Sequence, residues 1–487
     1  MPKRIILIVA LNQITSYAAP LITFPLLIRA FDIASYGLWI EVNTIINLLV
    51  IVGFSGVAQS LNIAVGRFGD DSEKVYINSL YIIGVISVIV FAITFFMAPL
   101  INQVFTRQPI GDTIIRIASM MLLTNGLLQL SPHVSRLRQR TTASVIVEIM
   151  VSVMRIVAAV FALLTHDLAL FATSHVILQT AVVIPLAIVA FQGLHFSLPS
   201  LPIIRSLVSD GLNLSVVNQA NWLVMYGDRL LLSLLSISSA VAIYSASYQL
   251  TLILAALALP VLYVLLPAVT NRWKNGDITG TQQQVRESSR VMQIMVIPGV
   301  VGLTLLSDYL LEILGSKEFA TGFLLVGMIA CGIAVDFIGN NSLQYIFYAQ
   351  GRSGVLRKTY MQAAALNLLA NLAAIPLLGY HGAGIVTVMT FLFIFYRLWS
   401  QTQMPFTALF DTNVTWRCLA ASAIMAAWVL LTASLNVFNL ILAIVGGAVI
   451  YCASAVLFKA ISPVEVKAVV RSIMSRIQGL NLPVERS

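Results

Sequence analysis

The sequence begins with a long segment that carries no charged side chain: residues 5–28 contain no Asp, Glu, Lys or Arg. As a helix that rises about 1.5 Å per residue, this segment is long enough to cross a hydrocarbon core of roughly 30 Å. Similar segments recur to the end of the chain, which is 59% hydrophobic and 10% charged. Soluble domains carry roughly 25% charged residues. The sequence therefore predicts an all-α integral membrane protein.

The apolar segments of spanning length predict about fourteen transmembrane helices. Their spacing predicts an N-terminal six-helix bundle over residues 1–191, a cytoplasmic linker over residues 192–210 and a C-terminal six-helix bundle over residues 211–403. An extra helix pair is expected over residues 404–460. Residues 461–487 are expected to form a cytoplasmic amphipathic tail, because their apolar residues recur on one helical face.

The distribution of charge predicts the orientation of the chain. The sequence has 28 Lys and Arg against 19 Asp and Glu. Most of the basic residues fall in alternate connecting segments, a bias that places both termini in the cytoplasm. They do not gather on one domain, so nucleic-acid binding is not expected. The connections are too short for a catalytic domain, and the chain has no phosphate-binding loop motif. We therefore expect a transporter with no cofactor or metal.

Ionisable residues inside membrane segments are costly and are therefore candidate functional residues. Glu148 and Arg155 lie about two turns apart, on the same face of the fifth predicted helix. In one interpretation Arg155 binds an anionic substrate and Glu148 tunes its charge. In the other, equally consistent with the sequence, both residues form structural pairs with neighbouring helices.

Five further charged residues are candidates. Arg29 and Arg116 lie near helix ends, and Arg229 lies deeper, so all three are candidates for anion binding. Arg29 could instead simply anchor its end of the first helix, and for Arg116 snorkelling to the bilayer surface is the favoured interpretation. Asp228 and Asp336 are candidates for ion coupling, although Asp228 and Arg229 are consecutive and a structural role is favoured for that pair.

Uncharged polar residues cluster in the first predicted helix of each half. Asn12 and Gln13 lie in the first helix, and Asn218 and Gln219 lie in the seventh. Hydrogen bonds between helices would account for several of them. Their matching positions instead favour the wall of a hydrated cavity between two halves, the usual location of a substrate site in transporters built from repeats.

Several stretches resemble the polysaccharide-exporter branch of the multidrug/oligosaccharidyl-lipid/polysaccharide (MOP) flippase superfamily, and in particular O-antigen flippases of the Wzx type. The resemblance rests on the following stretches, in order along the chain: Ser35–Trp39, Gly53–Gly56, Tyr226–Arg229, Ala242–Ser245, Asn367–Asn371 and Ile375–Gly384. It covers the whole chain at low density. The first helix lacks the arginines that related flippases of peptidoglycan precursors can carry.

This resemblance implies two six-helix bundles arranged as a V, with an extra helix pair. It also implies that the protein moves an undecaprenyl-pyrophosphate-linked oligosaccharide across a bacterial inner membrane, from the cytoplasmic to the outer leaflet. The oligosaccharide would be an O-antigen unit of lipopolysaccharide or another surface-polysaccharide repeat. The implied partners are a polysaccharide polymerase and a chain-length regulator. Guanidinium groups suit such a substrate, because they match the geometry of phosphate oxygens.

Two alternatives remain open. A cation-coupled multidrug exporter of the same superfamily would need an acidic pocket, whereas the acids in the membrane segments (Glu41, Glu148, Asp228 and Asp336) are few and partly matched by arginines. A membrane-embedded polysaccharide polymerase or glycosyltransferase would need charged external loops, and the loops here are short and poor in charge. A purely structural scaffold would leave the polar clusters unexplained.

Overall fold

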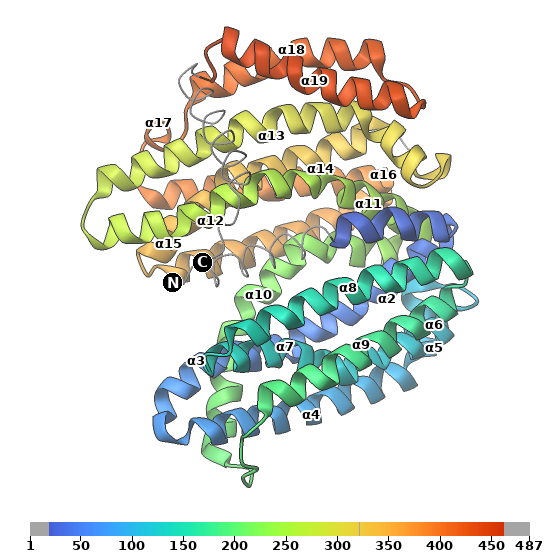
Figure 1. Ribbon diagram of the computed structural model, residues 1–487, viewed down its shortest axis with the longest axis vertical. Helices are drawn as coiled ribbons and strands as arrows, with labels where there is room; N and C mark the ends of the chain where they lie inside the picture. The colour runs from blue at the N-terminus through green and yellow to red at the C-terminus, as the bar shows by residue number, and fades with distance from the viewer. Residues whose placement is uncertain (1–18, 321, 462–487) are drawn as a thin grey trace, which may run out of the picture.

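The computed structural model describes residues 19–320 and 322–461 (Figure 1). Within these ranges the chain is helical and contains no β-strand. Eleven helical segments in the described part are long and apolar enough to cross a membrane. These observations confirm the predicted all-α membrane fold. The predicted tail, apart from Ile461, lies outside the described residues.

The helices of the first half form one group, in the lower part of Figure 1. They are α2 (Ile33–Gly53), α3 (Ser55–Phe68), α4 (Ser72–Phe96), α5 (Ala98–Ile101), the π-helical turn η2 (Asn102–Thr106), α6 (Gly111–Ser119), α7 (Met121–Leu137), α8 (Thr141–Thr165) and α9 (Leu168–Phe191), with the short turn η1 (Gly69–Asp71) after α3. The apolar helix Ala19–Ala30 precedes them. Its Ile28 side chain lies against Gly315, so this helix also contacts the second half of the chain.

The helices of the second half form the upper group in Figure 1. They are α11 (Ser238–Thr251), α12 (Ile253–Lys274), α13 (Ile278–Leu314), the short turn η3 (Lys317–Phe319), α14 (Phe323–Val335), the π-helical turn η4 (Asp336–Asn340), α15 (Asn341–Ala349) and α16 (Ser353–Thr402). After α17 (Phe406–Leu409), the pair α18 (Thr412–Thr432) and α19 (Val437–Leu457) packs on the outer side of α13.

The eleven segments and the fourteen predicted helices differ for three reasons. The first predicted helix is described only from residue 19. The continuous element α16 consists of two helices joined at Gly379, whose φ of +59° breaks the helical path. The long helix α10 (Leu201–Leu235) is absent from the eleven and is rich in polar residues, which lower its hydropathy.

Helix α10 connects the two groups of helices. It packs against α3 and α2 of the first group and against α16 of the second. It begins at Leu201, so residues 201–210, predicted as part of the linker, are helical. Pro202 occupies the first turn, where its missing N–H removes no helical hydrogen bond. The division of the chain into domains at the predicted boundaries remains a prediction.

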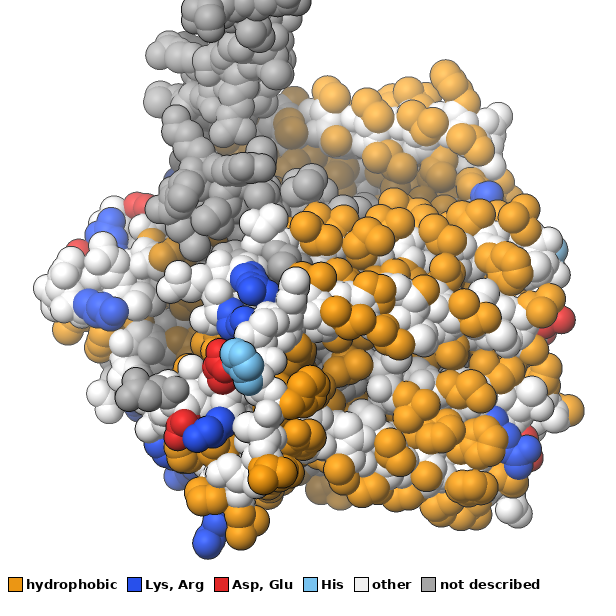
Figure 2. All heavy atoms as spheres, turned by 60° about the horizontal axis from the view of Figure 1, so that its bottom comes forward, with side chains coloured by type: hydrophobic (Ala, Val, Ile, Leu, Met, Phe, Trp, Pro, Cys, Tyr) orange, Lys and Arg blue, Asp and Glu red, His pale blue; other side chains and the backbone are white. Residues whose placement is uncertain are grey.

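Basic side chains gather at one end of the molecule, which we call the basic end (Figure 2). This end contains the connections between α3 and α4, between α7 and α8 and between α9 and α10. Two hydrogen bonds join them to neighbouring helices: Arg138 donates to the carbonyl oxygen of Ala190 at 2.7 Å, and the Asn78 side chain accepts from the Ser200 N–H at 2.8 Å. The surface between this end and the opposite end is mainly hydrophobic in Figure 2, as expected for a surface that faces lipid.

The first group of helices makes two very close backbone contacts, one with α10 and one with the second group. A Cβ atom added to Gly56 of α3 would lie 2.7 Å from the carbonyl oxygen of Gly211 in α10. A Cβ atom added to Gly37 of α2 would lie 2.0 Å from the carbonyl oxygen of Ser238, at the start of α11. Only glycine permits such close approach of two backbones. The first group is therefore in close backbone contact with α10 towards the basic end and with the start of α11 of the second group at the opposite end.

This packing predicts opposite effects for two alanine substitutions in the same helix. Gly56→Ala should lower the free energy of unfolding by about 1–3 kcal/mol, because its methyl group meets the backbone of α10. Gly66→Ala should raise it by up to about 1 kcal/mol, because no atom lies within 4 Å of the added Cβ and alanine favours a helix. Thermal unfolding of both purified variants in detergent measures the difference, and equal stability would contradict the described contact.

Candidate functional site

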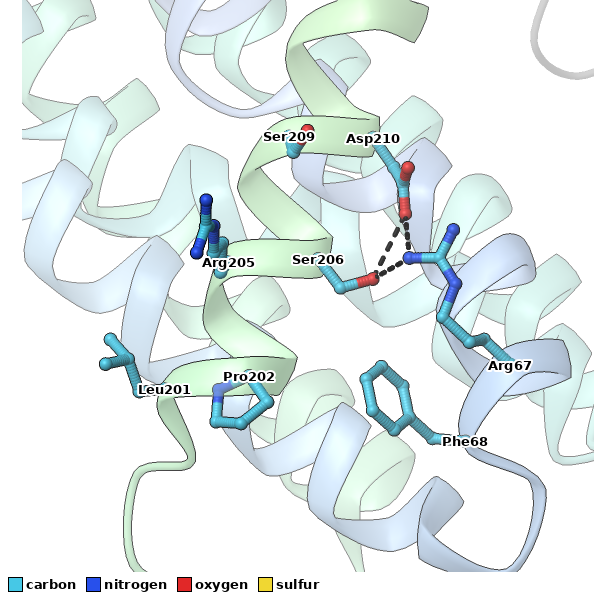
Figure 3. Close-up of a pocket in the computed structure, with 8 residues that line it drawn as sticks. All are labelled: Arg67, Phe68, Leu201, Pro202, Arg205, Ser206, Ser209 and Asp210. Atoms are coloured by element: carbon cyan, nitrogen blue, oxygen red, sulfur yellow. Dashed lines mark hydrogen bonds and ion pairs between the residues drawn. The ribbon is translucent and has the colours of Figure 1, made fainter.

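A pocket of about 500 Å³ opens at the basic end, between the last turn of α3 and the beginning of α10 (Figure 3). Gly69 ends α3 with a φ of +40°, so that Arg67 lies in the last helical turn, where the helix dipole favours a cation. The lining residues are Arg67, Phe68, Leu201, Pro202, Arg205, Ser206, Ser209 and Asp210. The pocket therefore lies where the first group of helices meets the connecting helix.

An ion pair links the two sides of this pocket. Nη1 of Arg67 donates to Oδ2 of Asp210 at 2.8 Å and also to the hydroxyl of Ser206 (Figure 3). The Ser206 hydroxyl donates to the same carboxylate oxygen at 3.1 Å. The Arg67 and Asp210 side chains are 50% and 20% exposed. An ion pair this accessible contributes about 1 kcal/mol or less, so it orients α3 and α10 without binding them tightly.

Arg205 adds a second guanidinium group to the lining. Its side chain is exposed, and it makes no hydrogen bond or ion pair with another described residue. Together with Ser206 and Ser209, the two arginines provide the donor-rich, positive surroundings that bind phosphate groups. The sequence alone did not single out Arg67 or Arg205, because positive charge is expected in cytoplasmic connections anyway. The sequence offers one indication of this pair: Arg67 and Asp210, which directly precedes the predicted C-terminal bundle, carry opposite charges.

Arg155, the first predicted substrate residue, is exposed although it lies well inside α8. It is within electrostatic range of Tyr226 on α10. Tyr226 is 43% exposed and stacks on Trp222 with ring centroids 5.5 Å apart. The structure thus brings Arg155 within electrostatic range of the polar connecting helix α10.

The predicted polar cluster on α10 is only partly accessible. Asn218 and Gln219 are half-buried, and Gln219 donates from Nε2 to the Ser215 hydroxyl at 3.3 Å. A hydrogen bond within one helix leaves both the cavity-wall and the structural interpretation open. Asn12 and Gln13 lie outside the described residues.

Glu148 and Arg155 both lie on α8, as predicted, but Glu148 has a different ionic contact. Its Oε1 lies 3.9 Å from Nη2 of Arg136, at the end of α7. This contact ties the beginning of α8 to α7 at the basic end. Arg136 is therefore the partner that a structural role of Glu148 requires. The tuning of Arg155 by Glu148 stays a prediction.

Arg29 and Arg116 lie apart from this region. Arg29 donates from Nε to the carbonyl oxygen of Leu314 at 2.9 Å and from Nη2 to that of Ile313 at 2.7 Å, at the end of α13. Arg116 lies over the ring of Phe95, 5.8 Å from its centroid. Both contacts correspond to the anchoring roles that the sequence left open.

Asp228 and Arg229 form a buried cluster with tyrosines. Their closest charged atoms, Asp228 Oδ1 and Arg229 Nη1, are 3.8 Å apart. The Asp228 carboxylate accepts from the Tyr244 hydroxyl, and the Arg229 guanidinium lies 4.2 Å from the ring centroid of Tyr248 and 4.9 Å from that of Tyr226. Both charges are almost completely buried. In this conformation the cluster is enclosed, so a substrate would not reach Arg229.

Asp336 occupies a different buried environment, in the π-helical turn η4. Its two carboxylate oxygens accept from the amide groups of Asn340 at 3.1 Å and Asn341 at 3.0 Å. Such π-helical turns often occur at functional sites. Among the described residues, no group of three or more His, Cys, Asp or Glu is arranged to hold a metal ion. Ion coupling at Asp228 and Asp336 stays a prediction.

A third buried acid, Glu41, lies at the end of the molecule opposite the basic end. Glu41 of α2 accepts on Oε2 from the Ser238 hydroxyl at 2.8 Å, beside the close contact of Gly37. Its other oxygen, Oε1, has no hydrogen-bond partner within the described part of the chain. Burial of an unpartnered carboxyl oxygen is costly. The closed contact at this end is therefore maintained at the expense of an unsatisfied polar atom.

The buried cluster predicts a large stability effect for Arg229→Met. Removal of one partner from a buried ion pair costs about 3–5 kcal/mol, because the remaining charge has no compensation. Arg116→Met should cost less than about 1 kcal/mol, since Arg116 is exposed. The folded yield and the melting temperature in detergent measure both variants. If Arg229→Met were as stable as Arg116→Met, the structural role of this cluster would be refuted.

Known transporter structures are similar to this chain in fold. A lipid II flippase, MurJ, in an inward closed conformation, aligns with a TM-score of 0.73 over 93% of this chain and 98% of its own, at 14% sequence identity. An inward-facing multidrug resistance MATE family transporter of the MOP superfamily aligns with a TM-score of 0.63 over 80% of this chain and 94% of its own, at 13% identity. A MOP superfamily transporter from Pyrococcus furiosus aligns with a TM-score of 0.54, at 12% identity, over 83% and 97% of the two chains. The chain has the fold of these transporters.

Comparison of sequences identifies the family. No curated protein sequence matches the chain. A family model described as "Polysaccharide biosynthesis protein" matches residues 3–273, which is more than half of the 487 residues. This match includes all of the first group of helices, the connecting helix α10 and the pocket at the basic end. The chain therefore belongs to the polysaccharide biosynthesis protein family.

Proposed function

We propose that this protein is a flippase that moves undecaprenyl-pyrophosphate-linked oligosaccharide from the cytoplasmic to the outer leaflet of a bacterial inner membrane. The oligosaccharide is an O-antigen unit of lipopolysaccharide or another surface-polysaccharide repeat unit. Movement occurs by alternating access, in which the contacts at the two ends of the helix groups open in turn. The N- and C-termini lie in the cytoplasm.

One observation carries this proposal: arginines line a pocket between the first group of helices and the connecting helix α10 in a member of a polysaccharide biosynthesis family. Arg67 and Arg205 line the pocket, and the exposed Arg155 lies deeper, near α10. A headgroup with two phosphates needs such cationic partners inside the membrane. The lipid tail would remain in the bilayer. A polymerase and a chain-length regulator would then use the translocated unit.

A multidrug exporter is the second candidate, and Asp336 is the observation that favours it. This acid is buried and accepts hydrogen bonds from two amide groups, and it has no ion pair with another described residue. An acid in such surroundings could serve a cationic drug or a coupling ion. The arginines at the basic end instead disfavour cationic cargo. An integral-membrane polymerase or glycosyltransferase is the least favoured function.

Gene deletion in the native host tests the choice between the two. The flippase predicts that undecaprenyl-linked repeat units accumulate on the cytoplasmic face and that surface polysaccharide is lost. The exporter predicts normal surface polysaccharide together with increased sensitivity to cationic dyes. The second outcome would refute the proposed function.

Arg155→Ala should reduce export at least about tenfold without lowering the protein level, because a charge-assisted contact to phosphate is lost. Arg155→Lys should recover only part of the activity, since lysine cannot form two parallel hydrogen bonds to a phosphate. Arg357→Ala, which removes an exposed arginine of α16, is the matched control. Surface polysaccharide of complemented deletion strains measures each variant. Full export with Arg155→Ala would remove this residue from the site.

Asp336→Asn tests ion coupling separately. This substitution keeps the shape of the side chain but removes its charge. If Asp336 couples transport to a cation, the variant should still exchange substrate between leaflets in vesicles. It should no longer respond to an imposed ion gradient. A gradient response equal to that of the wild type would exclude Asp336 as the coupling residue.

A further inference from the structure

We propose that the pocket between α3 and α10 is the loading site for the pyrophosphate group of the substrate. We further propose that the bound group displaces Asp210 from Arg67 and so opens the contact at the basic end. This inference rests on the flippase function proposed above. It adds a binding site and a trigger for the first opening step.

The pocket has the size and the donors that a pyrophosphate group needs. Its volume is about 500 Å³. The seven oxygen atoms of a pyrophosphate occupy on the order of 200 Å³, if each takes about the 30 Å³ of a water molecule. Arg67 and the Ser206 hydroxyl already surround one anionic oxygen, that of Asp210. This arrangement shows that the pocket stabilises an anion at this position.

The Arg67 guanidinium is available for exchange of its anionic partner. Its side chain is half exposed, so a phosphate reaches it without prior unfolding of either helix. A phosphate offers more charge and more acceptor oxygens than a carboxylate, and it pairs strongly with guanidinium. Arg205 lines the same pocket without an ionic partner among the described residues, and it adds attraction for an incoming dianion. Electrostatics therefore favours the replacement of Asp210.

The displaced carboxylate lies next to the tight backbone contact. Asp210 directly precedes Gly211, whose carbonyl oxygen lies closest to Gly56. A phosphate on Arg67 leaves the carboxylate of Asp210 without its cation and beside a like charge. Repulsion then acts on α10 at the point where it touches α3. Substrate binding should therefore separate the two helices at the basic end.

The same phosphate chemistry is offered by the headgroups of anionic phospholipids and by free pyrophosphate. We assign the site to the lipid-linked pyrophosphate, because two arginines from different helices line the pocket and a pyrophosphate carries more charge than a phosphodiester. Parallel measurements with phosphatidylglycerol and with inorganic pyrophosphate distinguish these sources.

Distance measurements between spin labels test the opening step. Labels are attached at Gly66→Cys in α3 and Val208→Cys in α10, in the full chain with Cys331, Cys418 and Cys452 replaced by alanine. Both positions are exposed and neither lines the pocket. In phosphatidylcholine vesicles, undecaprenyl pyrophosphate should lengthen the label distance. Phosphatidylglycerol should not, and inorganic pyrophosphate, which lacks the tail that concentrates the headgroup at the membrane, should do so only at a much higher concentration. No lengthening with undecaprenyl pyrophosphate, or equal lengthening with either competitor, would overturn the assignment.

Three variants separate a binding site from a structural ion pair. Asp210→Asn should lengthen the label distance without added lipid, yet bind undecaprenyl pyrophosphate at least as tightly as the wild type. Arg67→Gln should also lengthen the label distance, but it should weaken binding on the order of tenfold. Arg205→Ala should weaken binding by a similar factor and leave the label distance short. Arg357→Ala is the control. Thermal stabilisation by undecaprenyl pyrophosphate measures the binding.

The variants test the loading site, and the wild type tests the flippase function. If Asp210→Asn and Arg67→Gln weakened binding equally, Arg67 would be only a structural partner of Asp210 and the loading site would be refuted. In that case, normal export by the wild type would leave the flippase function intact. Failure of the wild type to export any undecaprenyl-linked glycan would instead refute the proposed function itself.

Discussion

A polar side chain on a membrane-crossing helix must lie against protein or water, because lipid tails offer it no partner. Helix α10 meets this constraint at two places, one in each group of helices. At the basic end Asp210 pairs with Arg67 of the first group. In the middle, Asp228 and Arg229 are enclosed by tyrosines of the second group. The polar connecting helix thus contacts both halves because neither half alone satisfies it.

The strength of these interactions differs in a way that suits alternating access. The Asp228–Arg229 cluster is buried and therefore costly to break, so it keeps α10 with the second group. The contacts between the groups are weaker. One is a half-exposed ion pair beside Gly56, and the other is a buried glutamate with one unsatisfied oxygen beside Gly37. A ligand or proton that changes either contact by a small free energy can therefore shift which end is closed.

Much of the fold could be predicted from the sequence, because apolar segments of spanning length have few alternatives in a membrane. The beginning of α10 could not, since residues 192–210 are predicted to form a linker, whereas Pro202 also suits the first turn of a helix. The site was harder to predict. The depth of Arg155 in the membrane makes it a candidate, and its role stays a prediction, whereas the contacts of Glu148 and Arg29 depend on helix packing. Arg67 and Asp210 become neighbours only through the contact between α3 and α10, which are far apart in the sequence.

We propose that the protein carries a phosphorylated headgroup across the bilayer between its helices while the lipid tail stays in the membrane. Transport of a fluorescent undecaprenyl-pyrophosphate-linked oligosaccharide by the purified protein in vesicles is the decisive measurement. A flippase should make the glycan accessible to an enzyme on the opposite side at a rate well above that of protein-free vesicles. A rate equal to that of protein-free vesicles, together with transport of cationic dyes, would show that the protein is not this flippase.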